Sequence, residues 1–501
     1  MCLMCSCQKH PLFRTIKSYP LLTFLIMMFF LPGVLKAGDD PLRKSLVKIF
    51  TTIQNPNYYE PWRVDAQQEV FGSGCIIKGH RILTNAHVIS NQISIKVLKD
   101  GDTKKYTAKK EFVAHDCDLA VLKVDDPDFF KGTKPVTFGE VPFLRDKVQV
   151  YGYPVGGEDL SITEGVVSRV EIIPYAHSDK RLLGVQTDAA VNPGNSGGPA
   201  FKNRRLVGVV FEGYYAVDTQ NISFFIPVPV INRFLGEIKK GGYRNVPALG
   251  LFTESLENDS LRSYLGMKSR QTGILITHVV YKSSAWDKLQ ENDVLTGIDG
   301  YPVANDKTIP FRKNERLHYT YPLCLRRIGD KIKIKILRHG KPKTISLVLN
   351  EENKLIPDIQ YDISPTYFIF DGLVFTPLNE NYIRTIKDPP PQFLALKNEL
   401  PSENQKQIVL LSHILTHEIN KGYDAQYSNI IVRKVNGVHV SEMKDLIKAF
   451  EKPIARNHIV EVENPEHVIN KMIFDAEKSK QSTVEIMSLY HISSDRSLDL
   501  K

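Results

Sequence analysis

Residues 187–199 read Thr-Asp-Ala-Ala-Val-Asn-Pro-Gly-Asn-Ser-Gly-Gly-Pro, and the interpretation of the chain starts from them. Small residues flank Ser196, so this serine can occupy a tight turn with its hydroxyl exposed. Glycine permits the backbone angles that such a turn needs. The main-chain N–H groups of the turn can then converge where the negative oxygen of an acyl-transfer intermediate develops. A plain surface turn rich in glycine, proline and asparagine is the alternative.

A serine hydroxyl is a weak nucleophile and needs a base, usually a histidine that a carboxylate orients. Residues 81–88, RILTNAHV, predict a short apolar strand that runs into a turn carrying His87. Residues 115–124, HDCDLAVLKV, place Asp118 directly before an alternating apolar strand. Asp116 is the rival carboxylate, but Asp118 abuts the strand, where it would be shielded from water. The order histidine, aspartate, serine, with each residue at a strand edge, indicates a catalytic triad.

The protein between residues 45 and 236 is expected to be mainly β. Short β-rich runs, many of them bounded by turn residues, predict a sandwich or barrel. These runs are 70–77, 93–98, 147–151, 165–172, 206–211 and 223–228. The length suffices for two small barrels with a cleft between them. A helix at 231–236 that ends at Gly236 would close this region.

Four motifs, TNAHV, DLAVLKV, GYPVGG and TDAAVNPGNSGGP, together resemble the HtrA (Deg, or Do-like) family of serine proteases. The resemblance implies a chymotrypsin-like double β-barrel followed by one or more PDZ domains. It implies that His87 is the general base, Asp118 the orienting carboxylate and Ser196 the nucleophile. The main-chain N–H groups of Gly194 and Ser196, with Asn195 between them, resemble the oxyanion hole. No cofactor and no metal are implied.

Substrate choice is less well defined by the sequence. Asp188 could be mistaken for the carboxylate of a trypsin-like specificity pocket, but it belongs to the motif that carries the resemblance. Members of that family favour aliphatic residues at the cleavage point. The apolar strand at 221–227 is expected to line the pocket, so we expect cleavage after small or medium aliphatic residues.

Residues 248–350 resemble a PDZ domain. Such a domain adds an extended peptide as a strand, while loop N–H groups capture the terminal carboxylate. The loop Leu249, Gly250, Leu251 and Phe252 is the candidate, and the expected ligands are peptides with apolar C-termini. Asn292 replaces a usual glycine, which asparagine can do because it also enters the left-handed region. The alternating run at 331–336 predicts a half-buried strand.

Residues 360–490 resemble a divergent second PDZ-like domain, as in the plant-type Deg branch. The segments at 372–378 and 432–440 predict strands, and Met443, Leu446 and Phe450 share a helical spacing. No clear carboxylate-binding loop precedes this region, so an internal docking or assembly role is expected. The tail after Thr483 carries no readable motif.

Residues 1–37 combine basic residues with an apolar run of 15 residues at 21–35. This pattern favours a secretory signal peptide and a bacterial periplasmic location, with cleavage after Ala37. An uncleaved membrane anchor facing the periplasm and an organellar location are the alternatives. Without this segment the net charge is about +5, and no basic tract interleaved with aromatics indicates nucleic acid.

The six cysteines do not form a disulfide scaffold, since only Cys75, Cys117 and Cys324 follow the leader. The combined prediction is an ATP-independent endopeptidase that degrades unfolded or damaged proteins and forms a homo-oligomer, a trimer or a multiple of trimers. A chaperone or adaptor that mainly holds clients is one alternative. A narrow-specificity processing protease is the other.

Overall fold

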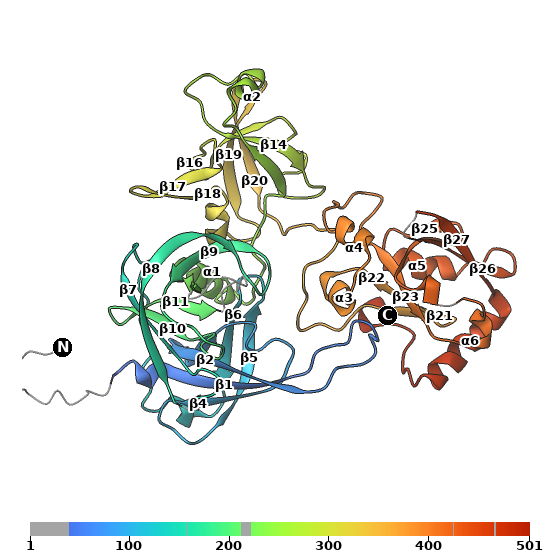
Figure 1. The fold of residues 1–501 in the computed structure, drawn as a ribbon, viewed down its shortest axis with the longest axis horizontal. Helices are drawn as coiled ribbons and strands as arrows, with labels where there is room; N and C mark the ends of the chain where they lie inside the picture. Colours follow the sequence, from blue (N-terminus) through green and yellow to red (C-terminus); the bar gives the residue numbers. More distant parts are fainter. Residues whose placement is uncertain (1–39, 158, 212–221, 424, 465–466) are drawn as a thin grey trace, which may run out of the picture. The chain divides into compact units, whose positions relative to one another are not determined.

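A computed structural model describes residues 40–157, 159–211, 222–423, 425–464 and 467–501 (Figure 1). The expected signal segment at residues 1–37 lies outside this described part. No helix among the described residues is long and apolar enough to cross a membrane. The chain is mainly β, as the sequence predicts, and its strands form two closed barrels followed by two sheet domains.

The first barrel closes in the strand order β1-β2-β3-β6-β5-β4. Its strands are β1 (Leu46–Ile53), β2 (Gln68–Ile77), β3 (Arg81–Thr84), β4 (Gln92–Lys99), β5 (Tyr106–Ala114) and β6 (Leu119–Val124). Short 3-10 turns lie at η1 (Arg43–Ser45) and η2 (Pro127–Phe130). Branched side chains such as those of Val47, Ile49 and Ile82 fill its core without exposed surface. Burying them stabilises the barrel by roughly 1.5–3 kcal/mol per side chain.

The second barrel closes in the order β10-β11-β12-β9-β8-β7. Its strands are β7 (Lys147–Gly152), β8 (Ser161–Pro174), β9 (Arg181–Thr187), β10 (Pro199–Lys202), β11 (Arg205–Phe211) and β12 (Ser223–Pro227). Helix α1 (Val228–Ile238) follows β12 and buries Ile231 and Phe234. The prediction that this helix ends at Gly236 is wrong. The helix continues to Ile238, with Gly236 inside it. A Cβ at Gly236 would come within 2.5 Å of the Arg327 guanidinium, which packs against this side of the helix.

The first sheet domain, residues 248–350, is built on the order β13-β14-β15-β19-β20, with β16 paired to β15. Its elements are β13 (Leu251–Ser255), α2 (Asp259–Tyr264), β14 (Ile274–Val279), β15 (Val294–Ile298), β16 (Tyr301–Pro302), β17 (Thr308–Arg312), β18 (Glu315–His318), η3 (Tyr321–Leu325), β19 (Lys331–Arg338) and β20 (Lys341–Val348). The alternating strand is confirmed, because Ile332, Ile334 and Ile336 are buried and the lysines between them are exposed. Asn292 adopts a φ of 69°, the left-handed conformation expected of it.

The second sheet domain, residues 367–500, has the order β21-β22-β23-β24-β26-β27, with β25 paired to β24. Its elements are β21 (Phe368–Phe370), β22 (Leu373–Pro377), α3 (Glu380–Thr385), α4 (Pro391–Leu396), β23 (Val409–Ile414), η4 (Glu418–Asn420), η5 (Ala425–Tyr427), β24 (Ile430–Val435), β25 (Val438–His439), α5 (Met443–Phe450), β26 (Asn457–Glu463), β27 (Ile469–Asp475), α6 (Ala476–Leu489) and η6 (Leu498–Leu500). Met443, Leu446 and Phe450 are buried on α5, as their spacing predicts.

The tail of the chain belongs to this second sheet domain although no motif announces it. Asp371 is fully buried and accepts a 2.6 Å hydrogen bond from the Ser482 hydroxyl of α6. Further along, the Ile369 N–H donates to the Asp495 carbonyl at 2.7 Å. The last helix and the residues after it therefore complete the domain.

Candidate active site

His87 and Asp118 meet because the strands that carry them are neighbours. β3 pairs with β6 antiparallel, with Thr84 opposite Ala120, so the end of one strand lies beside the start of the other. His87 Nδ1 lies 2.7 Å from Asp118 Oδ2, and the His87 main-chain N–H donates to Asp118 Oδ1 at 2.9 Å. The Asn85 side-chain amide donates to the Asp118 carbonyl at 2.8 Å. Both the ring and the backbone of His87 are thus fixed against one carboxylate.

Asp118 is shielded from water, with 1% of its surface exposed. Burial by itself would raise the pKa of this carboxyl. The charge of His87 and the hydrogen bonds from it outweigh burial and hold the pKa of Asp118 below its usual value. An ionised, buried carboxylate fixes the tautomer of the histidine and stabilises the imidazolium that forms when the ring takes up a proton.

Asp116, the rival carboxylate, has other partners. Its Oδ1 accepts a 2.7 Å hydrogen bond from the Tyr243 hydroxyl, and its Oδ2 accepts from the Val246 N–H. Both partners belong to the segment that follows α1. The geometry therefore favours Asp118 over Asp116 beside the histidine, and it makes Asp116 an anchor of that segment.

The Ser196 turn lies between β9 and β10 and is bonded to the first barrel. The Ser73 N–H of β2 donates to the Ser196 carbonyl at 2.8 Å, and the Ser73 hydroxyl donates to the Gly194 carbonyl at 2.7 Å. The Thr84 hydroxyl, at the end of β3, donates to the Ser73 carbonyl at 2.7 Å. These bonds connect the serine turn to the strand that leads into His87.

Two glycines of the turn are required by close approach. Gly194 has a φ of 97°, and a Cβ there would come within 2.4 Å of the Tyr153 carbonyl oxygen. Gly197 has a φ of 85°, and a Cβ there would come within 2.1 Å of the Ser73 carbonyl oxygen. The GYPVGG segment, which contains Tyr153, therefore backs the serine turn.

The three residues of the candidate oxyanion hole differ in whether their main-chain N–H already has an acceptor. Among the described residues, no protein acceptor takes the N–H of Gly194 or Ser196. The Asn195 N–H instead donates to the Asn192 carbonyl at 3.0 Å. Within this turn the Asn195 N–H is therefore engaged, and the N–H groups of Gly194 and Ser196 stay the predicted donors of the hole.

Asp188 has a structural role at the edge of β8. Its Oδ1 accepts the Val166 N–H at 2.6 Å. This contact ties Asp188 to β8. The whole of β12 is buried, while Asn221 of the expected pocket strand lies outside the described residues.

The loop from Leu249 to Phe252 borders a cavity of about 680 Å³, and the cationic Lys180 and Arg181 also line it. Gly250 has a φ of 71°, and a Cβ there would come within 2.1 Å of Ser283 Cβ. Leu249 is buried and Phe252 is half exposed. The Lys307 ammonium donates to the Thr253 carbonyl of β13 at 2.6 Å, so one acceptor of this strand is already occupied.

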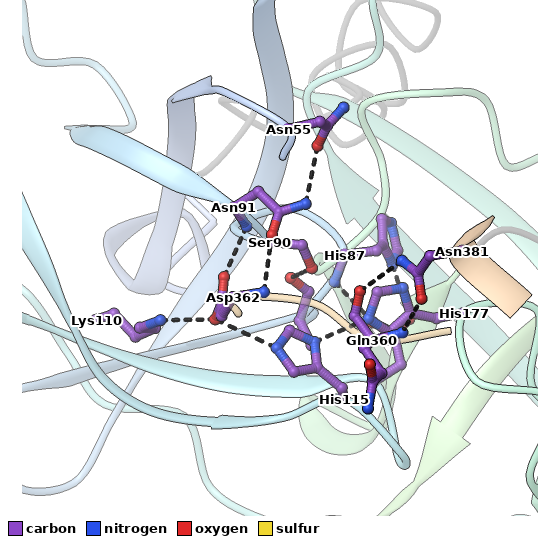
Figure 2. Close-up of polar contacts among 12 residues, drawn as sticks. Asn55, His87, Ser90, Asn91, Lys110, His115, His177, Gln360, Asp362 and Asn381 are labelled. Atoms are coloured by element: carbon purple, nitrogen blue, oxygen red, sulfur yellow. Dashed lines mark hydrogen bonds and ion pairs between the residues drawn. The ribbon is translucent and has the colours of Figure 1, made fainter. Parts of the chain in front are cut away.

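Sequence reasoning missed a group of residues beside His87, which Figure 2 shows. The ring of His177 lies 6.1 Å from the ring of His87, and His177 Nε2 lies 3.0 Å from His115 Nδ1. His115 Nε2 in turn lies 3.2 Å from Asp362 Oδ2. Asp362 belongs to the segment between the two sheet domains, 185 or more residues from the three histidines, and no motif marks it.

Comparison with known proteins identifies two domain types. A family model described as a trypsin-like peptidase domain matches residues 72–209, and one described as a PDZ domain matches residues 356–499. Protease Do-like 4, mitochondrial, of Arabidopsis thaliana is 37% identical over 93% of this chain and 87% of its own length. Protease Do-like 2, chloroplastic, of the same plant is 36% identical over 93% of this chain and 76% of its own.

A solved structure of the HtrA-type protease AlgW with a decapeptide is 24% identical to the chain. The match covers 62% of this chain and 97% of that one, with a TM-score of 0.47.

Proposed function

Because the chain belongs to the Do-like (HtrA/Deg) family of serine proteases, we propose that it is an ATP-independent endopeptidase with Ser196 as its nucleophile. The observation that carries the proposal is the double contact between His87 and Asp118, next to a serine turn that hydrogen bonds to the same barrel. In this account His87 is the general base and Asp118 the residue that orients it.

The proposed mechanism follows from these positions. Ser196 Oγ attacks the scissile carbonyl, and His87 accepts the hydroxyl proton and later returns it to the leaving amine. The N–H groups of Gly194 and Ser196 donate to the oxyanion of the tetrahedral intermediate, and such donors are worth about 2.7–4 kcal/mol each. Cleavage after small or medium aliphatic residues remains the expected specificity.

The first sheet domain is proposed to bind peptide C-termini at the loop from Leu249 to Phe252. Its left-handed glycine, its buried Leu249 and the adjacent cavity support this assignment. The cavity wall carries acidic as well as basic side chains, and Lys180 is paired with both Glu352 and Asp358, so the loop itself supports this assignment and the charge of the wall does not. The second sheet domain is proposed to serve in internal docking or assembly.

Degradation of unfolded or damaged proteins is the biological role that we propose. A chaperone that mainly holds clients is the alternative, and the paired His87 and Asp118 support proteolysis over it. Cleavage of reduced, carboxymethylated α-lactalbumin should greatly exceed cleavage of the native, calcium-bound form. Equal cleavage of both forms would contradict a preference for unfolded proteins. Cleavage of neither form, while one cellular protein is cut at a single site, would favour the narrow processing protease.

An organellar location now has more support than the periplasm, because the relatives named above carry the words mitochondrial and chloroplastic. In that case residues 1–37 act as a targeting segment rather than as a secretory signal. N-terminal sequencing of the protein from its native cells and light scattering of the purified chain test the location and the proposed trimer.

A further inference from the structure

Tyr361 and Asp362, between the two sheet domains, are bound to the protease domain by a dense set of contacts. The Tyr361 ring stacks on His177 with a centroid distance of 3.9 Å and an interplanar angle of 22°. It also stacks on His115 at 4.9 Å. The Tyr361 hydroxyl donates to the His177 carbonyl at 2.8 Å. One aromatic ring thus covers both histidines that stand behind His87.

Asp362 fixes the same segment by polar contacts, visible in Figure 2. The Lys110 ammonium lies 2.6 Å from Asp362 Oδ2, and the Asn91 N–H donates to Asp362 Oδ1 at 2.7 Å. In return the Asp362 N–H donates to Asn91 Oδ1 at 2.7 Å. Asn91 lies four residues after His87 in the sequence. Asp362 therefore contacts both the turn that follows His87 and the ring of His115.

The segment is also tied to the second sheet domain. The Gln360 N–H donates to Asn381 Oδ1 at 2.8 Å, and the Asn381 amide donates back to the Gln360 carbonyl at 2.8 Å. Asn381 lies on α3. On this side Gln360 and Tyr361 border a cavity of about 580 Å³. The segment therefore contacts the protease domain through Tyr361 and Asp362 and the second sheet domain through Gln360.

We propose that Tyr361 and Asp362 are positioning residues for His87. Docked on the protease domain, they hold His115 and His177 as a fixed wall behind His87 and Asp118, and release of the segment lowers the rate at which Ser196 is acylated. This inference rests on the proposed function. The hydrogen bonds between Gln360 and Asn381 connect this segment to the second sheet domain, so that domain is linked to His87 and Asp118 through the segment.

The electrostatics around His177 supply a reason why docking matters. Burial, aided by His87 and His115 and opposed by Asp118 and Asp362, lowers the pKa of His177 from 6.5 to about 3. A neutral His177 leaves His87 free to take up the proton of Ser196. When the segment leaves, burial is relieved and the pKa of His177 returns toward its usual ~6.5. Below that pH a second positive charge beside His87 then opposes proton uptake.

The test is the rate at which diisopropyl fluorophosphate labels Ser196 in the full chain, because this reagent needs no peptide-binding site. Ser196 Oγ bonds to phosphorus, fluoride leaves, and His87 accepts the proton. At pH 8, Tyr361→Ala should label about tenfold more slowly than the wild type. At pH 6 the ratio of the wild-type rate to the variant rate should be larger still. Tyr361→Phe keeps the stacked ring and should stay within about threefold of the wild type, while Asp362→Asn should fall between the two.

Two matched controls lie in the same segment and outside these contacts. Ile363→Ala removes an exposed apolar side chain, and Glu351→Gln removes an exposed charge. Both should label at the wild-type rate. Thermal unfolding of each variant separates a loss of folded protein from a loss of reactivity, and if Tyr361→Ala does not fold, Asp362→Asn decides.

If the wild type labels at Ser196 while folded Tyr361→Ala labels at an unchanged or increased rate, this inference alone is overturned. Asp362→Asn replaces Tyr361→Ala in this comparison if the latter does not fold. A loss that is the same at pH 6 and pH 8 also overturns the part assigned to His177. Absence of labelling in the wild type overturns the proposed function and this inference with it.

Discussion

Asp118 contacts His87 twice, through its Oδ2 at 2.7 Å from the ring nitrogen and through its Oδ1 at 2.9 Å from the main-chain nitrogen. One carboxylate therefore sets both the backbone and the ring orientation of the candidate base. Asp116, two residues earlier, bonds to Tyr243 and Val246 instead. The two aspartates can be separated by experiment.

Asp118→Asn should lower kcat by roughly 10⁴-fold, because an amide favours the wrong tautomer of His87. Asp116→Asn should change kcat less than tenfold but lower the free energy of unfolding by about 1–3 kcal/mol, since it weakens two hydrogen bonds. Steady-state kinetics and denaturant unfolding of both variants check this. The opposite ranking of the two kcat values would transfer the orienting role to Asp116.

Gly197→Ala should disable the serine turn. Its Cβ would lie 2.1 Å from the Ser73 carbonyl oxygen and 2.2 Å from the Thr84 hydroxyl, so the turn or β2 must move. A displacement of that size should cost about 100-fold in kcat/KM. Gly79→Ala is the matched control, because Gly79 has a φ of 88° and nothing within 4 Å of a Cβ. It should cost only about 1–2 kcal/mol of stability. Equal activity of the two variants would contradict the role given to Gly197.

Acid should destabilise the second sheet domain through His413. Burial lowers the pKa of His413 from 6.5 to about 4. The unfolded chain thus binds a proton between these values while the folded chain does not, and stability falls as pH decreases from about 6.5 toward 4. Linkage gives a loss of about 2 kcal/mol by pH 5.

His413→Gln should remove this slope, whereas His439→Gln, at an exposed histidine of the same domain, should keep it. Denaturant unfolding at pH 7 and pH 5 measures the difference. An identical pH slope in wild type and His413→Gln would show that His413 is protonated in the folded state too.

Peptides with free apolar C-termini should bind the first sheet domain with a Kd that is roughly micromolar. Fluorescence titration of the Ser196→Ala chain checks this with each peptide in free and amidated form. Gly250→Ala should abolish binding, because its Cβ would overlap Ser283, whereas Gly300→Ala has nothing within 4 Å and should bind normally. Equal binding of free and amidated peptides would exclude carboxylate capture.

The barrels and the approach of His87 to Asp118 could be predicted because their signals are local. Alternating apolar residues mark β6 and β19, and the residues flanking Ser196 report the backbone of its own turn. His87 and Asp118 each lie at the end of a recognisable strand. Antiparallel pairing of these two strands then brings the residues together.

The contacts of Tyr361 and Asp362 could not be predicted, because they depend on where an irregular segment lies on a surface far away in sequence. His115 belongs to a motif whose aspartates carry its signal, and His177 belongs to a turn without any motif. The use of the Asn195 N–H within its own turn likewise depends on a hydrogen bond that spacing does not reveal. Helix α1 continues past Gly236 to Ile238, and the tertiary neighbour that approaches this glycine, Arg327, is not visible in the local sequence.

The role of Ser196 as the nucleophile is tested most directly by the degradation of unfolded casein. The wild-type chain is compared with Ser196→Ala, and Ser269→Ala, at an exposed serine, is the control. We expect the wild type and the control to cleave casein at equal rates. Ser196→Ala should lose about 10⁴-fold or more while keeping its thermal stability. Cleavage by purified Ser196→Ala at the wild-type rate would show that Ser196 is not the nucleophile.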